Sequence, residues 1–373
     1  MSGFAVRGWC PDAWRPMAAG DGLLLRVRPP LGRLSCAQMR MIADVATAQG
    51  NGLIDLTSRA NLQLRGVQLE ALVQLLPVLV DHGLVDADPL NEAKRGMIVA
   101  PGWREGDDSW RIGRDLVARL VDLPVLPGKV GFVIDAGATR VLGEESGDFR
   151  IERARDGGLI LRADGRAKGM AVAHGAEADA LVALAHWFVA SGGAAAGRMA
   201  RHDAPLPAFA SGDAVPAPSD PVMPGTQLAG FVVGVPFGRI AAAQLAALAD
   251  GGHAVRITPW RSLLVEGLAV PPIEGLIADP ADPLLRVDAC PGRPSCPQAS
   301  VETRALARRI APYVRGRLHV SGCAKGCARA GPADVVLTGW EGRFDLSFNA
   351  RAGDPPTIKG LKPAQLLSHF GAD

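Results

Sequence analysis

Two short segments far apart in this chain repeat one pattern, and this repeat strongly limits the folds the chain can adopt. Residues 32–44 (GRLSCAQMRMIAD) match residues 238–250 (GRIAAAQLAALAD) at Gly, Arg, Ala, Gln, Ala and Asp. Each copy runs on into an extended stretch that ends in a threonine and then an arginine, Arg59 in the first copy and Arg261 in the second. Self-similarity of this kind indicates a duplicated structural unit. We therefore interpret Arg261 as the repeat counterpart of Arg59.

The first copy also carries clear signals for a helix. Ser35 followed three residues later by Gln38 is a capping-box pattern, and apolar residues then recur at helical spacing until Gly50, which predicts a helix over 36–49. Between the copies the pattern indicates a separate α/β stretch, followed by a segment rich in proline over residues 203–224. We interpret that segment as an interdomain linker.

Four of the six cysteines lie close together near the C-terminus. Two are separated by five residues and two by three, and both pairs stand among Gly and Pro. Such loops can turn several thiolates toward an inorganic core, while small residues let backbone amides approach it. The pattern favours an iron–sulfur cluster and leaves a zinc site or unrelated thiols open. The candidate ligands are Cys290, Cys296, Cys323 and Cys327, whereas Cys10 is better interpreted as a small buried residue.

Composition excludes several classes of protein. The chain has 373 residues, 48% of them apolar, so it can bury the cores of two to three domains. Its net charge of +2, from 40 basic and 38 acidic residues, argues against a general nucleic-acid binder. No leader or membrane-spanning pattern is visible, so we expect a cytoplasmic protein without a membrane partner. Thiols stay reduced in that compartment, which favours metal chemistry over disulfides.

The cysteine pattern resembles the cluster motif of the sulfite and nitrite reductase family, and the resemblance covers nearly the whole chain. It rests on the spacing of the two pairs and on Ser321 and Gly322 before Cys323. In that family four such cysteines hold a [4Fe-4S] cluster. The implied fold class is α+β, in which two ferredoxin-like half-repeats form one domain flanked by two α/β domains. The implied division is a first half-repeat with its N-terminal segment (1–89), a first α/β domain (90–202), the linker (203–224), a second half-repeat (225–280) and a second α/β domain with the cysteines (281–373).

The same resemblance implies a cavity, lined by basic side chains, for a tetrapyrrole. The arginine of a Thr-x-Arg motif, an arginine after the first α/β boundary and the lysine of a Leu-Pro-x-Lys motif line it in the family. Each of these side chains taken alone fits a solvated surface charge. Together they suit a ring with many carboxylates, because guanidinium groups bind carboxylates through two bonds at a time. The expected tetrapyrrole-binding residues are Arg59, Arg95, Lys129 and Arg261.

Two departures separate this chain from the sulfite reductases. Gly131 stands where they carry a second lysine, and Gly96 stands where they usually have Asn. The string from His319 to Ala328 is closer to family members that oxygenate a tetrapyrrole in aerobic cobalamin biosynthesis. The resemblance therefore implies an O₂-dependent monooxygenase that hydroxylates the ring at C20 and closes a γ-lactone.

The expected cofactors follow from the same resemblance. The [4Fe-4S] cluster would pass electrons to a mononuclear non-haem iron, whose ligands the sequence does not reveal. An external reductase using NADH or NADPH would supply the electrons. We interpret His319 as a core histidine. Two alternatives stay open: a sirohaem-dependent sulfite or nitrite reductase, and a non-catalytic iron–sulfur electron carrier.

Overall fold

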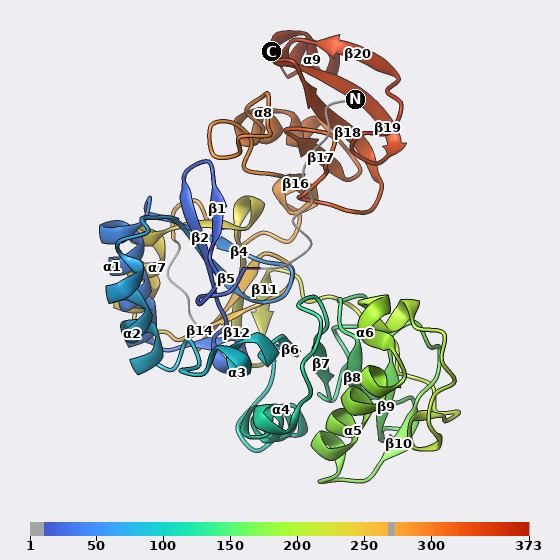
Figure 1. The fold of residues 1–373 in the computed structure, drawn as a ribbon. Helices are drawn as coiled ribbons and strands as arrows, with labels where there is room; N and C mark the ends of the chain where they lie inside the picture. The colour runs from blue at the N-terminus through green and yellow to red at the C-terminus, as the bar shows by residue number, and fades with distance from the viewer. Residues whose placement is uncertain (1–10, 268–272, 373) are drawn as a thin grey trace.

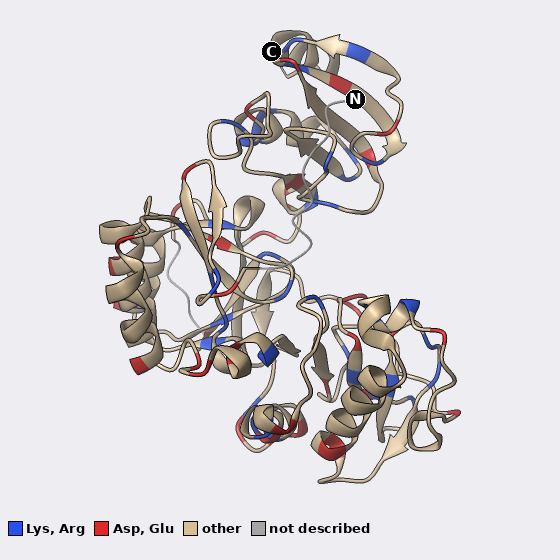
Figure 2. Cartoon of the chain, in the orientation of Figure 1, with Lys and Arg blue, Asp and Glu red and all other residues tan. Residues whose placement is uncertain are grey.

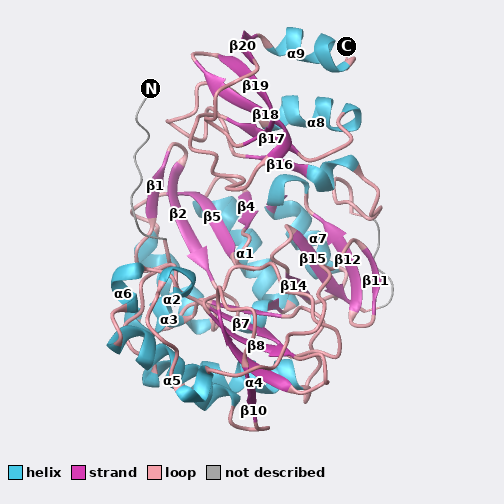
Figure 3. Ribbon diagram, turned by 90° about the vertical axis from the view of Figure 1, so that its right-hand side faces the viewer, coloured by secondary structure: helices cyan, strands magenta, loops and turns pink. Residues whose placement is uncertain are grey.

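The computed structural model describes residues 11–267 and 273–372, whose strands form four five-stranded sheets. Figure 1 shows a central body, a first α/β unit and a second α/β unit at the C-terminal end. Figure 3 shows, from the side, that the central body lies between the two α/β units. Lys and Arg are interspersed with Asp and Glu over all three bodies (Figure 2). The predicted α+β fold class with a duplicated architecture is confirmed.

The central body contains two antiparallel sheets that exchange a strand. The first runs in the order β1 (Met17–Ala19), β2 (Gly22–Val27), β5 (Leu62–Val67), β4 (Leu53–Leu56) and β13 (Arg239–Ala241). The second runs β11 (Gly225–Gln227), β12 (Gly230–Gly234), β15 (Ser262–Glu266), β14 (Val255–Ile257) and β3 (Arg33–Leu34). Since β13 pairs with β4 and β3 pairs with β14, each sheet borrows one edge strand from the other half-repeat. The two half-repeats therefore share one apolar core.

The helices of the repeat confirm the duplication. The predicted helix over 36–49 is α1 (Cys36–Gln49), and it packs against α7 (Ala242–Asp250). The Gln38 side chain accepts a hydrogen bond from the backbone N–H of Ser35 at 2.9 Å. Gln244 does the same for Ala241 at 2.9 Å, so the same capping interaction starts both helices. Helices α2 (Leu72–Asp81) and α3 (Pro89–Lys94) follow in the first half-repeat.

The two α/β units have the same strand order. In each, three parallel strands are followed by two antiparallel ones. The first unit contains β6 (Met97–Val99), β7 (Phe132–Asp135), β8 (Phe149–Arg153), β9 (Leu159–Ala163) and β10 (Met170–Val172), with helices α4 (Asp108–Ala118), α5 (Glu177–Ala190) and α6 (Gly193–Ala196). The second contains β16 (Val287–Ala289), β17 (Leu318–Ser321), β18 (Ala333–Trp340), β19 (Arg343–Ala350) and β20 (Ile358–Leu361), with helices α8 (Arg304–Ile310) and α9 (Pro363–Phe370). Duplication thus extends beyond the half-repeats.

The structure corrects one prediction about the repeat: Arg261 is not the counterpart of Arg59. The turn that ends each copy is closed by a threonine, whose backbone N–H donates to Asn61 O at 2.9 Å in the first copy and to Ser262 O at 3.1 Å in the second. The residue before that acceptor is left-handed in both turns, Ala60 at φ 51° and Arg261 at φ 56°. Arg261 therefore corresponds to Ala60, and the counterpart of Arg59 is Trp260. Matching residue types had shifted the alignment by one position.

The proline-rich segment 203–224 lies against the first α/β unit. Its backbone forms bridges from Ala214 to Gly169, from Pro216 to Ala154 and from Ser219 to Arg140. The segment therefore has fixed contacts along this unit, and the exact domain boundaries stay a prediction. In the described part of the chain, no helix has the length and apolar character needed to cross a lipid bilayer.

Candidate functional site

The two cysteine loops leave the same edge of the C-terminal sheet. Cys290 directly follows β16, and only Gly322 separates Cys323 from the end of the neighbouring parallel strand β17. Since parallel neighbours end at the same edge, their loops meet there. The backbone N–H of Gly322 donates to the Cys290 sulfur at 3.1 Å, which joins the two loops directly. All five cysteines in the described residues are free thiols, so the disulfide alternative is wrong for them, and Cys10 lies outside the described residues.

The four thiols are close enough to affect one another electrostatically. Burial raises the pKa of the Cys323 thiol, and the nearby Cys296 and Cys290 raise it further. Burial also raises the pKa of Cys327, with the other three cysteines adding to the effect. Four thiols near enough to influence one another, with a backbone amide directed at one sulfur, have the chemistry that an iron–sulfur cluster requires.

The structure does not show a site for a single metal ion. Among the described residues, no group of three or more His, Cys, Asp or Glu side chains is arranged to hold one. The mononuclear iron of the sequence analysis therefore has no assigned ligands. His319 is fully buried in β17, where burial lowers its pKa to about 4. Its two ring nitrogens have no hydrogen-bond partner within the described residues, and its position is that of a core histidine.

Three arginines converge on one buried carboxylate beside the cysteine loop. Asp288 in β16 lies 2.6 Å from Arg261, 3.1 Å from Arg317 and 3.7 Å from Arg329. Arg261 also donates to the carbonyl oxygen of Ala328, the residue after Cys327, at 2.7 Å. One carboxylate cannot neutralise three guanidinium groups, so this cluster carries an excess of two positive charges. It is suited to bind an anion with more than one carboxylate.

A cavity of about 810 Å³ opens over this arginine cluster. We call it the interdomain cavity, because residues from the central body, the first α/β unit and the second α/β unit line it. Its size lies at the upper end of the range for small-molecule sites in proteins. The polar, charged or indole-bearing lining residues are Ser58, Glu144, Glu145, Trp260, Arg261, Ser262, Arg286, Asp288, Arg317 and Arg329.

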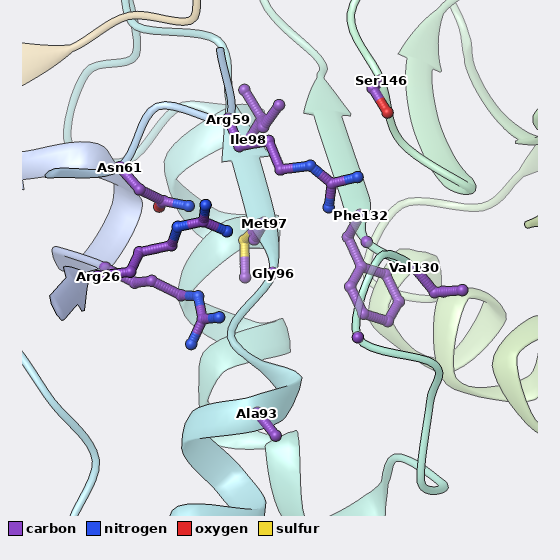
Figure 4. A pocket seen from close by; sticks show the side chains of 13 residues that line it. Arg26, Arg59, Asn61, Ala93, Gly96, Met97, Ile98, Val130, Phe132 and Ser146 are labelled. Carbon is purple, nitrogen blue, oxygen red and sulfur yellow. The ribbon is translucent and has the colours of Figure 1, made fainter. Parts of the chain in front are cut away.

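A much smaller cavity, of about 20 Å³, adjoins the first one, and it has room for little more than a water molecule. Figure 4 shows Arg59 extending toward Phe132, while Arg26 and Asn61 lie together on the side of the central body. Neighbouring residues line the two cavities: Ser58 and Glu145 line the interdomain cavity, and Arg59 and Ser146 line the smaller one. We call the second one the small cavity.

The structure brings together only some of the predicted basic residues. Arg59 lines the small cavity and donates to the backbone oxygen of Lys129 at 2.8 Å, and the Lys129 side chain is on an exposed residue. Arg261 lines the interdomain cavity instead. Arg95 is not among the lining residues of either, because its guanidinium group is bonded to Glu92 at 3.0 Å and to the backbone oxygen of Arg28 at 2.7 Å. Neither of the two cavities is lined by all four residues, and their role in binding a tetrapyrrole stays a prediction.

Sequence reasoning missed the residues that complete the cationic wall. Arg317 lies just before β17, and Arg329 follows Cys327 by two residues, so both are near the cysteine motif in the sequence. Asp288 could have been found in the same way, because it precedes Cys290 by two residues. Nothing in the sequence places Glu145 or Trp260 at the cavity, since each comes from a different unit.

Comparison with known proteins agrees with this fold. Residues 15–81 match the nitrite/sulfite reductase ferredoxin-like half domain. A precorrin-3B synthase from Sinorhizobium sp is 29% identical over 94% of this chain and 84% of its own length. A ferredoxin–nitrite reductase from Synechococcus elongatus is 26% identical over 90% of this chain and 80% of its own length. The solved structure of the Mycobacterium tuberculosis NirA protein matches with a TM-score of 0.64 and 19% identity, over 93% of this chain and 79% of that one. The resemblance predicted from the cysteine motif is confirmed.

Proposed function

We propose that this chain is a member of the nitrite and sulfite reductase family and that it acts as a precorrin-3B synthase. The reaction is the O₂-dependent hydroxylation of precorrin-3A at C20 with closure of a γ-lactone, as a monooxygenase of aerobic cobalamin biosynthesis. One observation carries the proposal: a large cavity with an excess of positive charge directly adjoins the loop of Cys327. The precorrin-3B synthase relative also matches a larger share of this chain, at higher identity, than the nitrite reductase from Synechococcus elongatus.

The substrate fits the chemistry of the interdomain cavity. A tetrapyrrole with many acetate and propionate groups is a polyanion with an apolar ring face. We propose that Arg261, Arg317 and Arg329 bind its carboxylates and that the indole of Trp260 contacts the ring. Arg59 lines the small cavity, and Lys129 is an exposed residue whose backbone oxygen accepts from Arg59. Both are proposed to bind further carboxylates of the same substrate. The guanidinium group of Arg95 is held by the fully buried Glu92 at 3.0 Å.

Glycine at position 131 argues against the sulfite reductase alternative. A side chain there would place its first carbon 2.7 Å from the backbone oxygen of Gly96, which is closer than such atoms approach in proteins. The second lysine of the sulfite reductases therefore cannot be accommodated without a shift of the backbone. With fewer cations over its centre, the site suits a large ring better than a small inorganic anion.

We propose that Cys290, Cys296, Cys323 and Cys327 hold a [4Fe-4S] cluster, which supplies one-electron transfer when bound. The backbone amide of Gly322 stabilises the sulfur of Cys290. The arginines would fix the ring relative to the cysteine loop. A mononuclear non-haem iron is part of the proposal without assigned ligands, and an external reductase fed by NADH or NADPH is the proposed electron donor. Sirohaem belongs only to the reductase alternative.

Purified protein tests the proposal. Anaerobic analysis should find iron and acid-labile sulfide in a ratio near that of a [4Fe-4S] cluster, and precorrin-3A should be converted to its hydroxylated lactone only when O₂ and a reductant are present. A sirohaem absorption spectrum together with turnover of sulfite or nitrite would replace this function with the reductase alternative. An electron carrier would tolerate the double change Arg59→Met and Lys129→Met. We expect that variant to bind precorrin-3A more weakly and to keep its cluster.

A further inference from the structure

A further cavity, of about 280 Å³, lies between the central body and the second α/β unit, and we call it the arginine cavity. Arg239 of β13 lines it from the central body, and Arg304 and Arg308 of α8 line it from the second α/β unit. Its other lining residues are Pro236, Phe237, Gln244, Gly275 and Ala305. Three cationic side chains therefore border this space, and none of the lining residues in the described part of the chain carries a carboxylate.

The guanidinium group of Arg304 is largely buried and has donors to spare. Its side chain is 17% exposed, and two of its nitrogen atoms, Nε and Nη1, have no hydrogen-bond partner among the described residues. The third, Nη2, lies 3.8 Å from the carboxylate of Asp55, which is beyond hydrogen-bond distance. Buried donors in proteins are nearly always bonded, so this group is suited to take an anionic ligand as its partner.

One carboxylate is shared among three arginines beside this cavity. Asp55 bonds to Arg239 at 2.9 Å and to Arg65 at 3.0 Å, and the more distant Arg304 is the third. Arg65 has a second partner in Asp21, at 2.9 Å. Burial, followed by the charge of Arg239, lowers the pKa of Arg304 to about 10, and Asp55 only partly opposes this. The positive charge of Arg304 is therefore incompletely balanced.

The two arginines of α8 are held in position by one aromatic ring. The guanidinium carbon of Arg304 lies 5.9 Å from the centre of the Phe237 ring, and that of Arg308 lies 5.5 Å from it. A cation within about 6 Å of a ring centre is attracted by its π electrons. Because the two arginines are four residues apart on one helix, both reach the same ring. The cations are thus positioned before a ligand arrives, which lowers the entropy lost on binding.

The equivalent place in the first half of the chain has a different balance of charge. There Arg33, the repeat counterpart of Arg239, donates two hydrogen bonds to Glu266, at 2.8 Å each. The cavity beside it is lined by three arginines and two glutamates, namely Arg33, Arg114, Arg256, Glu105 and Glu266. Two carboxylates thus balance the cations of that cavity. Duplication alone therefore does not account for the purely cationic lining of the arginine cavity.

We propose that the arginine cavity binds a small oxyanion with the size and charge of inorganic phosphate. Guanidinium groups bind phosphate oxygens through two N–H bonds at a time. The volume of the cavity lies just below the range for drug-sized ligands, which suits a small anion. Because Arg239 belongs to the central body and the other two arginines to the second α/β unit, the anion links these two bodies. This inference goes beyond the proposed function and does not depend on it.

The test measures binding of inorganic phosphate to the purified whole chain by titration calorimetry at constant ionic strength. Arg308→Met removes one exposed guanidinium group, and the affinity should fall about 10-fold, as is typical for loss of a charge-assisted hydrogen bond. The matched control is Arg114→Met. Arg114 lies on α4, the corresponding helix of the first α/β unit, and its guanidinium carbon lies 5.0 Å from the centre of the Trp110 ring. The control should bind phosphate as the wild type does.

A second variant, Arg304→Lys, keeps the charge of the buried arginine but cannot form two parallel bonds, and it should also weaken binding. A wild type that does not bind phosphate at millimolar concentration would overturn the proposal. Equal losses in Arg308→Met and Arg114→Met would do the same, because they would show a general effect of net charge. Binding that is lost in Arg317→Met but kept in both variants of α8 would place the anion in the interdomain cavity instead. No precorrin takes part in these measurements, so each outcome leaves the proposed function to its own test.

Discussion

Replacing Asp288 with asparagine tests whether one carboxylate organises the cationic wall of the cavity. Asp288 is 6% exposed and balances three guanidinium groups. Removing one partner of a fully buried ion pair costs about 3–5 kcal/mol. The three arginine side chains are 24%, 40% and 31% exposed, so water offsets part of that loss. We expect Asp288→Asn to lower the free energy of unfolding by about 2 kcal/mol, or about 30-fold in the unfolding equilibrium.

The variant should also respond to added anions, which gives a second measurement. With its carboxylate removed, the cluster has three uncompensated cations, and a tricarboxylate such as citrate can take the place of Asp288. Urea unfolding with and without citrate should therefore show a larger stabilisation of Asp288→Asn than of the wild type. The matched control is Asp250→Asn, which removes only the exposed ion pair with Arg40 and should cost under about 1 kcal/mol. Equal stability of the two variants, or equal effects of citrate on Asp288→Asn and on the wild type, would refute the reasoning.

Three further predictions concern the cluster, the substrate and the response to acid. Cys290→Ala should lose most of its iron and sulfide in anaerobic analysis, because the thiolate that accepts the Gly322 amide is gone. Arg317→Met should weaken binding of precorrin-3A about 10- to 100-fold in fluorescence titration, the loss of one charge-assisted hydrogen bond, with the cluster spectrum unchanged. Burial raises the pKa of Glu152, but bonds and charges from neighbouring arginines outweigh it and lower that pKa to about 2. Its stabilising effect is therefore complete above about pH 4.5 and is lost as the pH falls toward 2, so the stability gap between wild type and Glu152→Gln should close in acid unfolding curves.

The elements with strong local signals could be predicted from the sequence. The helix over 36–49 begins at a capping box and follows an apolar repeat, so its ends are set by interactions within a few residues. The cysteine loops could be predicted because the spacing of the four thiols in the sequence indicates the kind of metal centre that they can hold. The exchange of β3 and β13 between the half-repeats could not be predicted. Each strand is only two or three residues long, and no nearby residue indicates which strand it pairs with.

The basic residues show where residue type misleads. Arg95 matches its motif, but its guanidinium group donates a hydrogen bond to the fully buried Glu92. Only the fold shows that contact. Arg261 was aligned with Arg59 because both are arginines, whereas backbone conformation determines the register of the turn. The interdomain cavity needs three units in contact, so its members are scattered from Ser58 to Gly331 and share no sequence pattern.

The exchanged edge strands have a consequence for how the protein is made. The first central sheet is completed by β13, so it lacks a strand until the ribosome has passed residue 241. The first α/β unit lies between the two copies in the chain, so it leaves the exit tunnel before β13 does. The central body can therefore be completed only after the first α/β unit has been synthesised, although the first half-repeat precedes that unit in the chain. A ribosome-bound chain ending before β13 should remain sensitive to protease in its first half-repeat while its α/β unit is already resistant.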